Sequence, residues 1–99
     1  MTGGTIGADT SSVYGGRAVA IFKDSDGSAG TFTLDGGTVR TYSNSSYNGR
    51  TVHLITGTFN YNSGTVSATT SYTDTYQLWR QNGTTFNNPA NISLKTLNY

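Results

Sequence analysis

Turn-forming residues interrupt this chain at intervals of roughly 8–12 residues, which leaves room only for short strands between them. Clusters rich in Asp, Asn, Ser and Gly lie at 24–27, 35–37, 43–50, 60–64, 82–83 and 87–91. The segments between them are rich in Thr, Val, Tyr and Phe, which favour strands. The pattern therefore predicts an all-β fold of about 7–8 short strands, arranged as an antiparallel β-sandwich or a small barrel.

Glycine-containing turns between alternating segments indicate where the chain should reverse. Residues 35–37, Asp-Gly-Gly, separate 30–34 from 38–42, as expected of a hairpin. Two triplets occur twice each: Gly-Thr-Phe at 30–32 and 57–59, and Gly-Thr-Val at 37–39 and 64–66. We interpret these triplets as the exits of hairpins and not as an internal repeat.

Small polar residues make up more than half of the chain: 18 Thr, 13 Gly, 11 Ser and 9 Asn among 99 residues. Hydrophobic residues make up 33%, which predicts a thin core. Disorder would explain so low a content, but 12% aromatic residues argue against it. We therefore expect neighbouring subunits to complete the burial. Residues 1–16 are predicted to be a Gly/Ser/Thr-rich N-terminal arm or linker, and residues 17–99 a single β-domain.

Charge and cysteine content exclude several classes of protein. The net charge is +1 and the six Lys and Arg are dispersed, so no basic stripe for nucleic acid exists. No apolar run approaches the ~20 residues of a membrane span, and the residues after Met1 do not resemble a signal peptide. Without cysteine, disulfides and thiolate chemistry are absent. A virion protein, which is assembled in the reducing cytoplasm and released by lysis, fits this combination.

Residues that could carry catalysis or bind metal are few. His53 is the only histidine, and no motif joins it to a carboxylate. The segment 24–27, Asp-Ser-Asp-Gly, resembles the start of a calcium loop, but an ordinary turn is the better interpretation. The five Asp lie mostly beside Gly or Ser, where Asp commonly caps turns. We expect no catalytic residue, no metal, no cofactor and no enzymatic activity.

Aromatic residues offer the best indication of binding. They lie within or beside stretches rich in Ser, Asn and Gly, and flat rings flanked by amides suit sugars or protein surfaces. The alternative is that they pack in the core or between subunits. The candidate ligand- or receptor-binding residues are Tyr47, Tyr61, Tyr72, Tyr76 and Trp79.

One stretch resembles a known class of protein. Residues 14–22, Tyr-Gly-Gly-Arg-Ala-Val-Ala-Ile-Phe, lead into a Gly/Ser turn and the alternating Thr-Phe-Thr-Leu that ends at 34. This stretch is similar to small β-domains of bacteriophage tail fibres and related virion surface proteins. The resemblance implies a trimeric fibre part or a receptor-binding tip, and it carries over no catalytic residue.

The sequence thus predicts a non-enzymatic structural or adhesion protein on the virion surface, in a tail fibre or on the capsid. It would self-associate, as a homotrimer, contact other virion proteins and bind host receptor or glycan. Two alternatives remain: a secreted carbohydrate-binding module, and a capsid decoration protein.

Overall fold

The computed structural model describes residues 1–7, 17–23, 26–43, 50–70 and 76–99. Eight strands lie in these ranges: β1 (Thr5–Ile6), β2 (Arg17–Ile21), β3 (Thr31–Ser43), β4 (Arg50–Leu54), β5 (Thr58–Thr70), β6 (Tyr76–Arg80), β7 (Thr85–Asn87) and β8 (Thr96–Asn98). The described segments contain no α-helix. They therefore contain no helix that is long and apolar enough to cross a membrane.

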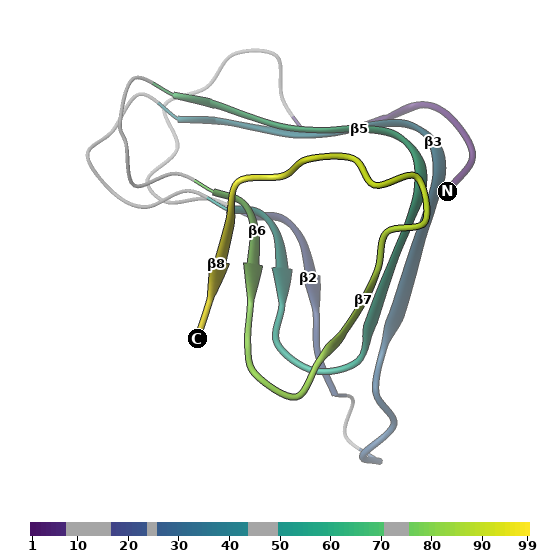
Figure 1. Ribbon diagram of the computed structural model, residues 1–99, viewed down its shortest axis with the longest axis vertical. Helices are drawn as coiled ribbons and strands as arrows, with labels where there is room; N and C mark the ends of the chain where they lie inside the picture. Colours follow the sequence, from purple (N-terminus) through teal and green to yellow (C-terminus); the bar gives the residue numbers. More distant parts are fainter. Residues whose placement is uncertain (8–16, 24–25, 44–49, 71–75) are drawn as a thin grey trace.

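Each of the strands β1 to β6 pairs in parallel with the strand two places further along the chain. One sheet has the order β1-β3-β5-β7 and the other β2-β4-β6-β8. The chain therefore winds in successive coils, each lying on the one before, as a parallel β-solenoid (Figure 1). The all-β prediction and the number of strands are confirmed. The antiparallel sandwich or barrel is wrong, because both sheets are parallel throughout.

The turn signals inside β3 and β5 bend the chain without reversing it. At Gly37 and Gly64, φ is +78° and +97°, values that glycine adopts at little cost. A Cβ on Gly64 would lie 2.7 Å from the carbonyl oxygen of Gly37, so the two corners are stacked in close contact. Thr31 pairs with Thr58 before this corner and Thr38 with Thr65 after it. The repeated triplets are thus corresponding positions of consecutive coils, and the interpretation as hairpin exits is wrong.

The first and last coils differ from this 27-residue spacing. Arg17 pairs with Arg50, 33 residues on, because the first coil carries an extra excursion closed by an antiparallel bridge between Lys23 and Ala29. At the other end, Leu78 pairs with Thr96, only 18 residues on. The last strand, β8, begins only at Thr96 and is three residues long.

The N-terminal residues lie along β3 of the same chain. The Met1 amino group donates to the carbonyl of Thr33 at 2.8 Å, and the Asp35 amide donates to the carbonyl of Met1 at 2.7 Å. Residues 1–7 thus form part of a first coil. The rest of the segment predicted as an arm or linker, residues 8–16, lies outside the described residues.

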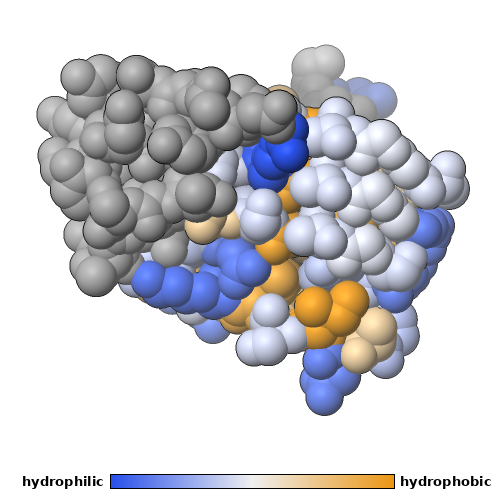
Figure 2. Space-filling model, turned by 90° about the horizontal axis from the view of Figure 1, so that it is seen from above, coloured by the Kyte–Doolittle hydropathy of each residue, from blue (hydrophilic) through white to orange (hydrophobic). Residues whose placement is uncertain are grey.

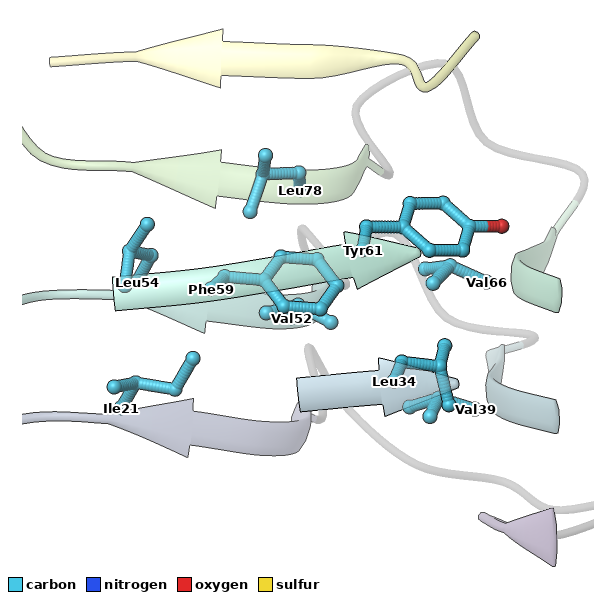
Figure 3. Packing of buried hydrophobic residues seen from close by; sticks show 9 residues of the cluster. All are labelled: Ile21, Leu34, Val39, Val52, Leu54, Phe59, Tyr61, Val66 and Leu78. Atoms are coloured by element: carbon cyan, nitrogen blue, oxygen red, sulfur yellow. The ribbon is translucent and has the colours of Figure 1, made fainter. Parts of the chain in front are cut away.

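The core is a narrow column of side chains between the sheets (Figure 3). It is built from rows of equivalent residues of successive coils; in one row the ring of Phe59 stacks on Phe32 at 5.7 Å and on Phe86 at 5.4 Å. The buried hydrophobic residues are Ile21, Leu34, Val39, Val52, Leu54, Phe59, Tyr61, Val66 and Leu78. Seen from above, hydrophobic residues occupy a narrow band of the surface (Figure 2). So thin a column explains the low hydrophobic content within one chain.

Candidate functional site

Aromatic and cationic side chains gather on the outer face of the sheet β2-β4-β6-β8. Val52 and Leu54 point into the core, so His53 between them points outward. His53 pairs with Trp79 on β6, and their rings stack at 5.4 Å. We call these two rings, together with the side chains around them, the Trp79 cluster. Its members are Arg17, Arg50, His53, Trp79 and Tyr99.

Hydrogen bonds hold His53 from both sides and leave it only 8% exposed. Its Nδ1 lies 3.2 Å from Nη1 of Arg17, and its Nε2 lies 2.6 Å from the hydroxyl of Tyr99. A guanidinium can only donate, so Nδ1 accepts and the neutral ring carries its proton on Nε2. That proton is donated to the Tyr99 oxygen. The hydroxyl hydrogen of Tyr99 consequently remains available for another acceptor.

The two arginines bring like charges onto adjacent strands. Arg17 and Arg50 are direct register partners, an arrangement that destabilises a sheet. The guanidinium carbon of Arg50 lies 3.4 Å from the centre of the Trp79 ring, a cation–π contact. Burial lowers the pKa of Arg50, and the charge of Arg17 lowers it further.

His53 is neutral at neutral pH because of this setting. Burial first, and then the charges of Arg50 and Arg17, lower its pKa from 6.5 to about 4. A neutral imidazole can accept from Arg17 and hold the guanidinium in place. His53 is therefore suited to positioning its neighbours.

The cluster has more hydrogen-bond donors than acceptors. Nε of Arg50 and Nε1 of Trp79 are buried, and neither has a hydrogen-bond acceptor among the described residues. A buried donor without an acceptor costs about 1–3 kcal/mol. The unpaired donors of the cluster therefore lower the stability of the fold.

The candidate residues from the sequence fall in three different places. Trp79 is in the cluster, and Tyr76 lies on the same strand, under Nζ of Lys95 at 4.9 Å from the ring centre. Tyr61 lies in the core, 1% exposed, and donates its hydroxyl hydrogen to the carbonyl of Gly64 at 2.8 Å. Tyr47 and Tyr72 lie outside the described residues.

Sequence reasoning missed Arg17, Arg50 and Tyr99, and it considered His53 but set it aside because no motif joins it to a carboxylate. These four residues belong to the cluster. They are scattered over 83 positions, and only the pairing of successive coils brings them together. The recurrence of the Gly-Thr triplets was the signal that could have aligned those coils. Within the described ranges, no group of three or more His, Asp or Glu side chains could hold a metal ion; Asp24 of the calcium-loop alternative lies outside them.

Comparisons with protein-family models, with curated proteins and with solved structures found no match to this chain.

Proposed function

We propose that the chain is a non-enzymatic surface domain of a bacteriophage virion, in a tail fibre or on the capsid, that binds a host receptor or glycan. The observation that carries the proposal is the Trp79 cluster. Its aromatic and cationic side chains lie outside the column that stabilises the fold, and they place like charges next to each other. A binding role gives a reason for an arrangement that costs stability.

The architecture and the surface composition support a place in a virion. Successive coils contact only their neighbours in a solenoid, so such a scaffold is rigid and can lengthen by the addition of coils. Thr, Ser, Gly and Asn make up more than half of the chain, and these residues keep a protein soluble without high charge. Both properties suit a fibre or capsid part that is exposed after release.

Self-association, with a homotrimer as the expected state, is part of this proposal. The low hydrophobic content no longer supports it, since the narrow column accounts for that content. The support comes from the sheet edges: β2 and β8 are edge strands in the described sheet, with backbone groups on one side open to pairing. Sedimentation velocity at micromolar concentration tests the point, and a stable monomer would contradict it.

Binding of the labelled protein to a panel of intact bacterial strains tests the proposed recognition. We expect saturable binding that periodate treatment of the cells abolishes, because periodate cleaves the vicinal diols of glycans. Trp79→Ala should weaken binding about tenfold or more, as truncation of an aromatic anchor commonly does. Phe22→Ala is the matched control, since Phe22 is 59% exposed and outside the cluster; it should bind as the parent does.

Two results would count against this recognition, provided that circular dichroism shows both variants folded. One is equal loss of binding in both variants, and the other is no binding to any strain. Binding to purified capsids without binding to cells would instead support the capsid decoration alternative.

A further inference from the structure

The Trp79 cluster presents converging donors and two positive charges toward one region of the outer face. Arg17 uses Nη1 on His53 and retains further N–H groups. Tyr99 is 43% exposed, and its hydroxyl hydrogen is not used by His53. Building on the proposed function, we propose that the Trp79 cluster binds the carboxylate of an acidic sugar, with Arg17 and Tyr99 as donors and Arg50 as the second cation.

The charges of the cluster call for an anion. Arg17 and Arg50 are adjacent, and in the described part of the chain they contact His53 and the Trp79 ring. Neither of these two groups carries a negative charge that would offset a guanidinium. A carboxylate at this position would offset the repulsion and accept charge-assisted hydrogen bonds, which are roughly twice as strong as neutral ones.

The neutral state of His53 makes the arrangement possible. A protonated imidazole would repel Arg17 and could not accept its hydrogen bond. Because the pKa of His53 is about 4, the ring keeps the guanidinium oriented throughout the neutral range. His53 therefore acts as a positioning residue for Arg17.

The aromatic part of the cluster favours a sugar over other carriers of a carboxylate. The partly exposed rings of Trp79 and Tyr99 meet edge to face at 5.5 Å, so they offer an angled apolar surface to the CH face of a sugar. A nucleic acid would need cations spaced along its backbone. Arg80 instead binds Thr84 within its own turn, and Lys23 lies in the excursion of the first coil. Two neighbouring guanidinium groups fit one carboxylate better than a chain of phosphates.

Calorimetric titration with sialyllactose and with a hyaluronan tetrasaccharide, each compared with its methyl ester, tests the assignment. The esters keep the sugar and remove the charge. We expect at least one acid to bind about tenfold or more tightly than its ester, with affinity that falls as salt is added. Arg17→Gln and Arg50→Gln should each weaken the acid about tenfold. Lys23→Gln removes the same charge from an exposed site outside the cluster and should change little.

A second readout locates the bound acid independently of affinity. A carboxylate next to His53 adds negative charge and should raise the pKa of that ring, which NMR titration of its Cε1 proton measures. The methyl ester should leave the pKa where it was. An acid that binds without moving this pKa sits elsewhere, and the assignment would be overturned.

The remaining outcomes separate this assignment from the proposed function. Trp79-dependent cell binding together with equal affinity for acids and esters would overturn the carboxylate and keep the receptor-binding role. Failure of both acids to bind, with Trp79-dependent cell binding retained, would likewise overturn the carboxylate assignment and keep the receptor-binding role. Tighter binding of a sulfated disaccharide or of a thymidine oligomer, lost in Arg17→Gln, would replace the carboxylate with a sulfate or a nucleic acid. Absence of all binding, to sugars and to cells, would refute both proposals.

Discussion

Replacing Gly57 by Ala should destabilise the protein strongly, because the corner between β4 and β5 is stacked on the previous coil. Gly57 has φ +104°, and a Cβ there would overlap the carbonyl oxygen of Gly30 and lie 3.0 Å from its carbonyl carbon and its amide nitrogen. All three are backbone atoms, so no side-chain rotation can relieve the contact.

The expected cost has two parts. Backbone strain in an L-residue at this φ contributes about 1–2 kcal/mol. To relieve the overlap the corner must also move away from the previous coil by roughly 1 Å, which breaks the hydrogen bond from the Thr58 amide to Gly30, 3.0 Å long. That bond is worth about 0.5–1.5 kcal/mol net. The sum is about 1.5–3.5 kcal/mol, a substantial share of the roughly 5–15 kcal/mol that stabilises a typical domain.

Gly83→Ala is the matched control for this prediction. Gly83 has φ +86°, and a Cβ there would have no atom within 4 Å, so it retains the strain and lacks the overlap. We expect it to cost about 1–2 kcal/mol. Urea unfolding followed by far-UV circular dichroism and by Trp79 fluorescence measures both values. Equal destabilisation of the two variants would refute the stacked-corner explanation.

Two further expectations concern the pH dependence and the core. The folded chain holds the pKa of His53 at about 4 against an ordinary 6.5, so the unfolded chain binds that proton more readily. The free energy of unfolding should be fully retained above pH 6.5 and should fall as the pH drops toward 4. Urea unfolding at a series of pH values measures this decrease. If the same decrease persists in His53→Gln, another group causes it. Tyr61→Phe should cost about 1 kcal/mol, the net worth of the hydrogen bond to Gly64, and should leave sugar binding unchanged; weakened binding would show that Tyr61 acts beyond the core.

The sequence predicted the all-β character well because local residue preferences determine it. In β2 and β6, for example, Val19, Ile21, Tyr76 and Trp79 favour a strand locally. The direction of pairing was not predictable from the same signals, since a glycine with positive φ serves a hairpin and a solenoid corner equally. Residues 35–37 show this: Asp-Gly-Gly fits a primed turn, yet in β3 it bends a strand that continues. The triplets spaced by 27 residues were the evidence for coils.

The candidate site was predictable only in part, because the direction and partners of strand pairing decide which side chains meet. Trp79 stood out because it is the only tryptophan and clusters with Tyr72 and Tyr76 within eight residues. Its contact with His53 depends on which strands are neighbours, and β4 and β6 become neighbours only when the chain coils. Tyr61 was misleading because its sequence neighbours are polar, although strand alternation places its ring in the column. Arg17 and Arg50 lie next to each other only because they are register partners on β2 and β4.

The regular spacing of the central coils has a consequence for the length of this domain along the axis of the coils. Residues 31–57 form one full turn that ends where the equivalent Thr58 begins the next. A tandem copy of that segment, inserted after Gly57, would place phenylalanine on phenylalanine and glycine corner on glycine corner. Each such copy would lengthen the column by about 4.8 Å, the spacing of paired strands. The cross-section of the domain is thus fixed by its stacking, while its length can change in equal steps without a new core.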